Sequence, residues 1–140
     1  MNCWLISLED EEYKLMKKMG IISPPARYTG ALGKFSVGDL IIVYWISESE
    51  NVAPRLQGFN AFVKVIGCSP EPFRYKKRKR RGLQARHYKC TPCYFGDVRY
   101  YLKIVSHPNF SNIIQKGMFK ISKEDFRILK SAILPRGESP

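Results

Sequence analysis

The alternation of apolar and polar positions predicts several short strands and a helix towards each end of the chain. Residues 3–6 form a short apolar run, long enough for one buried strand, and residues 40–45 are the most strand-like segment. Residues 59–66, 87–95 and 98–105 also carry strand-like patterns, which predict three further strands. With the helices, the predicted order is strand, helix, four strands and helix.

Charges and caps support the two predicted helices. The first is expected to be capped by Ser7 or Asp10, to carry acidic residues in its first turn and basic residues in its last, and to end at Gly20. The second is expected to be capped by Ser122 and to end before Pro135.

The order of elements predicts an α+β fold, in which a mixed, mainly antiparallel sheet with flanking helices curls towards a small barrel. The 140 residues fit a single domain, which we place at residues 1–135, with residues 136–140 as a frayed tail. No stretch approaches the ~18 apolar residues of a membrane span, and the N-terminus does not resemble a secretory signal. We therefore expect a soluble, cytoplasmic protein with no membrane partner.

The charge balance indicates a polyanionic partner. The chain has 24 Lys and Arg against 12 Asp and Glu, a formal net charge of +12. An excess of this size attracts nucleic acid, the abundant polyanion inside cells. The charge itself does not distinguish RNA from DNA, and of the two we expect RNA. The alternative is a basic face that only keeps the protein in solution.

A run of six adjacent cations is the sharpest feature of the sequence. Because like charges repel and a charge is costly to bury, the run is expected to be a solvated loop that contacts phosphates. Phe73 and Tyr75 precede it, and bases stack on aromatic rings while cations hold the phosphates. The predicted backbone contacts are Arg27, Lys34, Lys76, Lys77, Arg78, Lys79, Arg80, Arg81 and Arg86.

Catalysis and metal binding find little support in the sequence. Cys90 and Cys93 form a lone C-x-x-C with His87 before it, but a structural zinc site normally needs a fourth ligand and a second close pair is missing. Nucleophile-elbow, phosphate-loop and metalloprotease motifs are also missing. We expect no enzymatic activity, no cofactor and no metal.

Short motifs in order along the chain resemble the EVE-domain family of the PUA-like superfamily, which is related to YTH domains. The motifs are CWLIS at residues 3–7, a basic residue with V-G-D and an apolar strand at residues 34–44, a strand at residues 62–65, and the helix start at residues 117–126. The resemblance implies a PUA-like pseudo-barrel with a pocket that holds a flipped-out base, often a modified one.

The resemblance also implies which residues line that pocket. Ser7 matches the serine that closes the first strand, Ser23 follows the first cage position, and Phe73 or Tyr75 matches the second cage aromatic. Ile22 stands where the family usually has Trp, so that wall lacks an aromatic face. The expected pocket comprises Ser7, Ile22, Ser23, Tyr44, Phe73 and Tyr75.

Tyr44 and its neighbour Trp45 are expected on opposite faces of their strand, so only one of them can face a given pocket. The leading hypothesis is a nucleic-acid-binding module that recognises a modified base. The alternatives are a non-catalytic component of an RNA–protein assembly without a working pocket and, less favoured, a hydrolase of small substrates.

Overall fold

A computed structural model describes residues 1–46, 58–91, 93–94, 101–103 and 117–134. The expected tail at residues 136–140 lies outside these ranges. The elements in chain order are β1 (Cys3–Glu9), α1 (Asp10–Met19), β2 (Ile21–Ile22), the 3-10 helix η1 (Ala26–Lys34), β3 (Leu40–Ile46), β4 (Gly58–Val65), β5 (Glu71–Tyr75), β6 (Arg78–Tyr88), β7 (Cys93–Tyr94), β8 (Met118–Lys120) and α4 (Lys123–Ile133).

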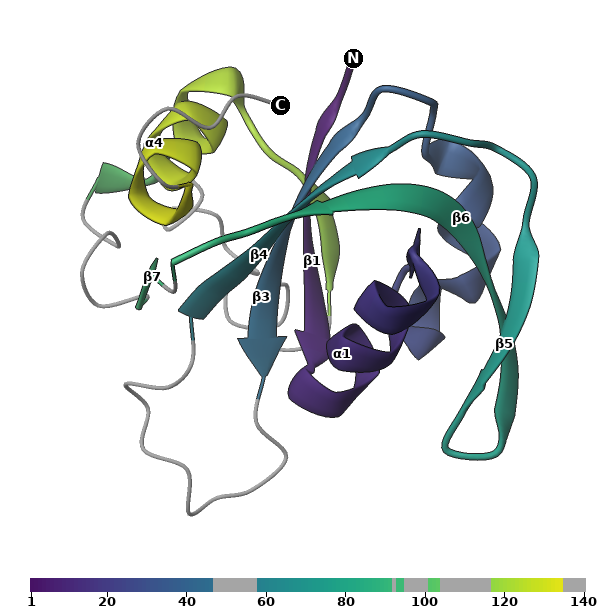
Figure 1. The fold of residues 1–140 in the computed structure, drawn as a ribbon. Coiled ribbons are helices and arrows are strands. Elements are labelled where there is room, and N and C mark those ends of the chain that lie inside the picture. Colours follow the sequence, from purple (N-terminus) through teal and green to yellow (C-terminus); the bar gives the residue numbers. More distant parts are fainter. Residues whose placement is uncertain (47–57, 92, 95–100, 104–116, 135–140) are drawn as a thin grey trace.

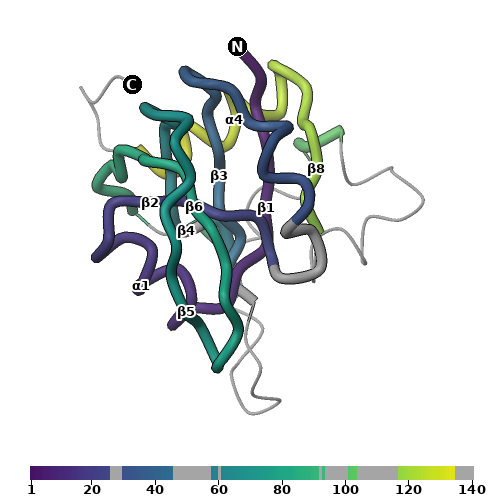
Figure 2. The backbone as a smooth tube through the Cα atoms, turned by 90° about the vertical axis from the view of Figure 1, so that its right-hand side faces the viewer, coloured from purple at the N-terminus to yellow at the C-terminus, as the bar shows by residue number. Residues whose placement is uncertain are grey.

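The strands form one mixed sheet, which confirms the α+β prediction (Figure 1). Its order is β2-β6-β4-β3-β1-β8, with β5 paired to β6 and β7 paired to β4. Among the described strands only β1 and β3 pair in parallel. The path ends at β2 and β8, which are not paired with each other, so the described strands do not close into the expected barrel (Figure 2).

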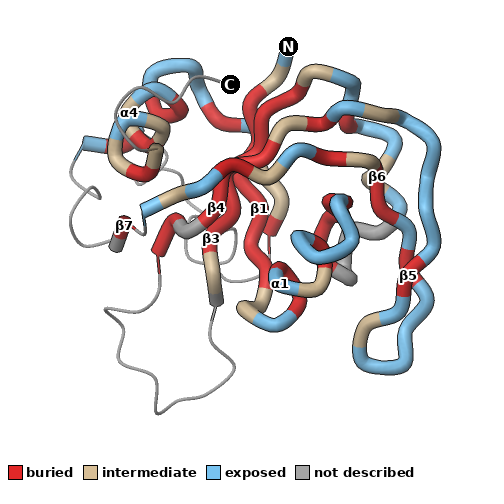
Figure 3. Tube along the Cα trace, in the orientation of Figure 1, coloured by how far each residue is buried: buried red, intermediate tan, exposed pale blue. Residues whose placement is uncertain are grey.

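The central strands are buried on both faces, which is why β3 is a continuous apolar run (Figure 3). Leu5 and Ile42 pack on the face covered by α4, whereas Ile6 and Ile41 pack on the face covered by α1. Tyr44 lies on the α4 face and its neighbour Trp45 packs on the α1 face, as alternation predicts.

The V-G-D motif joins the starts of β1 and β3. Gly38 adopts a φ of 94°, a conformation that favours glycine. The buried Asp39 carboxylate then accepts hydrogen bonds from the Asn2 and Ser36 backbone N–H groups and from the Trp4 indole N–H, at 2.9–3.0 Å. Trp4 is therefore a core residue with a fixed partner.

The predicted caps are partly confirmed. Ser122 caps α4 by accepting from the Asp125 N–H at 3.1 Å, and Gly20 ends α1 at a φ of 69°. The N-cap of α1 is Glu9, so the expectation of Ser7 or Asp10 was wrong. Ser7 is still in β1, because the strand runs three residues further than its apolar run.

Two strand predictions need correction. The segment at residues 87–95 is not one strand, since β6 ends at Tyr88 and β7 covers only Cys93–Tyr94. Residues 98–105 lie mostly outside the described ranges, and their described part, residues 101–103, is not in a strand.

His87 ties α1, β2 and β6 together. Its Nε2 lies 2.8 Å from the Ile21 carbonyl oxygen, and its Nδ1 lies 3.0 Å from the Tyr13 hydroxyl. A carbonyl only accepts, so Nε2 carries the proton and Nδ1 accepts from Tyr13. Burial lowers the pKa of His87, the hydrogen bond to Ile21 opposes this, and the charge of Lys17 adds to it.

A buried ion pair fixes the β5–β6 hairpin to α1. The Arg80 guanidinium pairs with the Glu12 carboxylate, and both side chains are at most 8% exposed. Arg80 also donates to the Pro24 carbonyl at 2.5 Å, and its guanidinium carbon lies 5.1 Å from the centre of the Phe73 ring. The other Glu12 oxygen accepts from the Glu9 backbone N–H at 3.0 Å, so one carboxylate both caps the helix and holds the hairpin.

We expect the free energy of unfolding to fall between about pH 7.5 and about pH 5.5. The folded-state pKa of His87 lies below the ~6.5 of an unfolded histidine, so the unfolded chain binds the proton first and is favoured as the pH drops. For one proton, the free energy of unfolding falls by at most about 1.4 kcal/mol per pH unit. Urea denaturation at several pH values measures this slope. The variant His87→Gln should lose most of this slope. An unchanged slope in this variant would contradict the assignment.

Removing the charge of Glu12 should destabilise the protein strongly. The change Glu12→Gln keeps an acceptor oxygen for the Glu9 N–H but leaves Arg80 buried without a counter-ion. We expect a loss of about 3–5 kcal/mol in the free energy of unfolding, measured by chemical denaturation. The matched control is Glu11→Gln on the same turn, where the side chain is exposed and the expected change is within about 0.5 kcal/mol. Equal stabilities of the two variants would show that the pair contributes nothing.

Candidate nucleic-acid interface

The run of cations forms a β-hairpin rather than the expected solvated loop. Tyr75 pairs with Arg78, which leaves Lys76 and Lys77 as a two-residue turn with φ values of 48° and 65°. Positive φ at both central positions is typical of a type I′ turn, where Asn-Gly is the least strained choice. Two lysines at these positions bring charge to the hairpin tip at a conformational cost.

Strand alternation separates the cations of the hairpin strands into two sets. Arg74 lies directly opposite Lys79, and Arg81 lies opposite Pro72, with all three cations exposed. Like charges directly opposite one another destabilise a sheet. No ion pair between described residues involves Arg74, Lys79 or Arg81. This outer face is therefore a patch of positive charge that the rest of the described chain does not compensate.

Arg80 faces the other way, and its burial corrects the expectation that none of the six cations can be buried. Only 4% of Arg80 is exposed, because Glu12 neutralises it and Phe73 covers it. It is therefore not one of the solvent-facing cations proposed to hold phosphates.

Glu9 holds the tip of the hairpin. It accepts the Tyr75 hydroxyl hydrogen at 2.6 Å and lies 3.0 Å from the Lys76 ammonium. Burial and this hydrogen bond raise the pKa of Tyr75, so the phenol stays neutral and donates. A phosphate at Lys76 would have to share this cation with Glu9, which makes Lys76 a weaker contact than its exposed neighbours.

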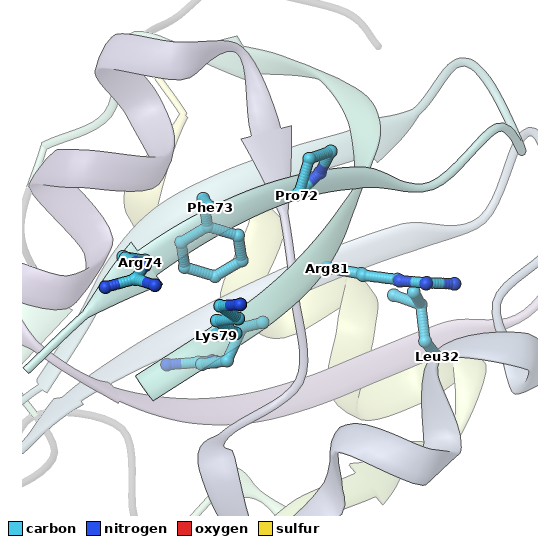
Figure 4. A pocket seen from close by; sticks show the side chains of 7 residues that line it. Leu32, Pro72, Phe73, Arg74, Lys79 and Arg81 are labelled. Carbon is cyan, nitrogen blue, oxygen red and sulfur yellow. The ribbon is translucent and has the colours of Figure 1, made fainter. Parts of the chain in front are cut away.

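A hollow of about 600 Å³ lies between η1 and the hairpin. Its apolar wall consists of Leu32, Pro72 and Phe73. The remaining lining residues are Arg74, Lys79, Arg80 and Arg81, so the lining contains four cations and no carboxylate. Figure 4 shows Arg74, Lys79 and Arg81 arranged around Phe73, with Leu32 contributed from η1.

The other predicted backbone contacts lie away from this hollow or outside the description. Arg86 is exposed on β6, and its guanidinium lies 4.7 Å from the centre of the Tyr88 ring. Lys34 is exposed at the end of η1. Arg27 belongs to η1, but its side chain lies outside the described residues.

The structure does not bring the six predicted pocket residues together. Ser7 pairs with Tyr44 across β1 and β3, and Tyr44 belongs to the core beneath α4. Ile22 and Phe73 belong to the core beneath α1, against which Tyr75 packs. The sheet separates the two groups, so a single pocket containing all six was a wrong expectation.

Five of the six predicted pocket residues are also closed off, and only Tyr75 is half-buried. At most 6% of Ser7, Ile22, Ser23, Tyr44 or Phe73 is exposed. The Ser23 hydroxyl donates at 3.2 Å to the Pro24 carbonyl, the same oxygen that accepts a hydrogen bond from Arg80. Ile22 and Phe73 remain together in the core on the α1 side, and the half-buried Tyr75 packs against that core rather than forming a cage.

Two further features are absent from the described part of the chain. No group of His, Cys, Asp and Glu there is placed to hold a metal ion, and Cys90 and Cys93 are not joined by a disulfide. No helix there is long and apolar enough to cross a membrane.

Sequence reasoning missed the hollow, and it also missed Glu9 and Glu12, which hold the hairpin beside the hollow. Phe73 and Tyr75 are two residues apart before the Lys76–Lys77 turn, a spacing that indicates a strand with one inward face. The contribution of Leu32 from η1 had no comparable signal, because it depends on how two distant segments pack.

Solved structures share this fold. Protein Atu2648 from Agrobacterium tumefaciens matches with a TM-score of 0.57 and 13% identity over 92% of this chain and 90% of that one. Rpa0253 from Rhodopseudomonas palustris matches with a TM-score of 0.55 and 12% identity over 94% and 92% of the two chains. A hypothetical protein from Leishmania major matches with a TM-score of 0.58 and 11% identity over 94% and 96%. No family model and no curated protein sequence matches the chain. At these identities the structural likeness shows the fold alone.

Proposed function

We propose that the protein is a non-catalytic nucleic-acid-binding module that contacts the phosphates of a single strand, RNA in preference to DNA, through the β5–β6 hairpin. The observation that carries the proposal is the outer face of the hairpin, where Arg74, Lys79 and Arg81 have no ion-pair partner among the described residues. Repulsion among these cations is relieved when phosphates bind between them.

The turn supports the same proposal. Lys76 and Lys77 occupy backbone positions that other residues fill with less strain, and local strain is often kept where function requires it. Lys77 and Arg78 are also exposed, Lys77 in the turn and Arg78 beside Tyr75 on the other face of the hairpin, so cations continue beyond the hollow to the tip.

The family assignment belongs to the same proposal. The ordered motifs that resemble EVE domains favour a PUA-like sheet, which here is open along its described strands. A base reader would use Ile22, Phe73 and Tyr75, the predicted pocket residues that share the α1 side, together with Ser23, which follows Ile22 in the chain. Ile22, Ser23 and Phe73 are buried, so a base cannot reach them in this structure. Their burial favours the alternative function, a component of an RNA–protein assembly without a working base pocket.

We expect binding to a short RNA strand to weaken steeply with salt. If about four phosphates are neutralised, a plot of log K against log salt concentration should have a slope near −3. The double change Lys77→Gln/Arg78→Gln should reduce its magnitude by about 1.4, which is two contacts at about 0.7 each. Fluorescence anisotropy at several salt concentrations measures both quantities.

The charge-matched control is Lys120→Gln/Arg127→Gln, which removes two exposed cations from β8 and α4. Its slope should remain that of the unmodified protein. A slope near zero in the unmodified protein, or equal effects of the two double variants, would disprove the hairpin mechanism.

A further inference from the structure

The hollow between η1 and the hairpin concentrates charge in a way that a flat basic face does not. Arg80 lines it, but Glu12 neutralises that guanidinium. Three exposed cations remain, Arg74, Lys79 and Arg81, and no carboxylate lines the hollow with them. The hollow therefore has a net positive lining within a concave surface, which strengthens its attraction for an anion.

The hollow is also larger and less polar than a lone phosphate requires. Its volume of about 600 Å³ is within the range of small-molecule pockets, about 300–1,000 Å³. Leu32, Pro72 and Phe73 provide an apolar wall beside the cations. This combination fits a ligand with an anionic group at one end and an apolar or aromatic body at the other, such as a nucleotide.

The charge favours a phosphate monoester over an internal phosphodiester. A monoester carries about −1.5 to −2 charges and three acceptor oxygens, whereas each internal phosphate of a strand carries one charge. Two guanidinium groups and one ammonium group on a single hollow match the greater charge and number of oxygens. In a nucleic-acid strand such a group occurs only at a phosphorylated end.

We propose that this hollow binds the terminal phosphomonoester, with its nucleotide, of a nucleic-acid strand. The inference rests on the proposed hairpin function and specifies which part of the strand is held there. The phosphate lies among Arg74, Lys79 and Arg81, and the terminal sugar and base lie against Leu32 and the exposed Pro72. The remaining phosphates follow the hairpin towards Lys77.

The test compares labelled oligonucleotides of one sequence that carry a 5′-phosphate, a 3′-phosphate or hydroxyls at both ends, by fluorescence anisotropy. One phosphorylated end should bind about tenfold or more tightly than the unphosphorylated strand, the effect of one hydrogen bond to a charged group. The change Lys79→Gln/Arg81→Gln should abolish this ratio. The matched variant Lys77→Gln/Arg78→Gln, on the same hairpin but outside the hollow, should weaken all three strands and keep the ratio.

All four substituted side chains are exposed, so the variants should fold, and circular dichroism melting checks this. Equal affinity for the three strands, with salt-dependent binding intact, overturns the end-binding inference and leaves the hairpin function standing. Salt-independent binding of all three strands overturns both. A nucleoside monophosphate added as competitor should displace the phosphorylated strand only at concentrations well above that strand's Kd. If it binds as tightly as the strand, the hollow is a mononucleotide site and strand-end binding is overturned.

Discussion

The buried pair between Arg80 and Glu12 is the interaction on which the position of the basic hairpin depends. In a two-stranded hairpin every second residue faces inward, so a run of six cations must turn at least one charge towards the protein. Burying that charge alone costs several kcal/mol, and only a partner in the interior offsets the cost. Glu12 supplies the negative charge, and the Pro24 carbonyl accepts a second guanidinium hydrogen.

The same pair sets the register of β5 against β6. A slip by one residue would bring Lys79 or Arg81 inward in place of Arg80. A lysine has one compact charge and lacks the planar fork that reaches Glu12 and Pro24 together. When Arg80 is the buried cation, strand alternation makes Lys79 and Arg81 face outward. The pair of Arg80 and Glu12 therefore determines the outer face that we propose binds phosphate.

Local patterns in the sequence predicted both helices, the Ser122 cap and the strand at β3, because each depends on neighbouring residues. The hairpin was missed because the partner of Arg80 lies 68 residues away in the chain, and a charge run without a visible partner indicates solvent. The predicted base pocket failed for a related reason. Whether Ser7 and Ile22 share a face depends on strand pairing, which local patterns do not contain.

Energetics decide between base recognition and phosphate contact as the main source of affinity. Opening the α1 core to admit a base would expose Ile22 and Phe73, at about 1.5–3 kcal/mol for each side chain. The two side chains together cost about 3–6 kcal/mol. Stacking one base returns about 1–3 kcal/mol, which at best balances the lower end of that cost. The hollow beside η1 is already formed and already charged, so binding there requires no such opening. Affinity should therefore come from the hairpin and the hollow, and any selectivity for a base must be added to them.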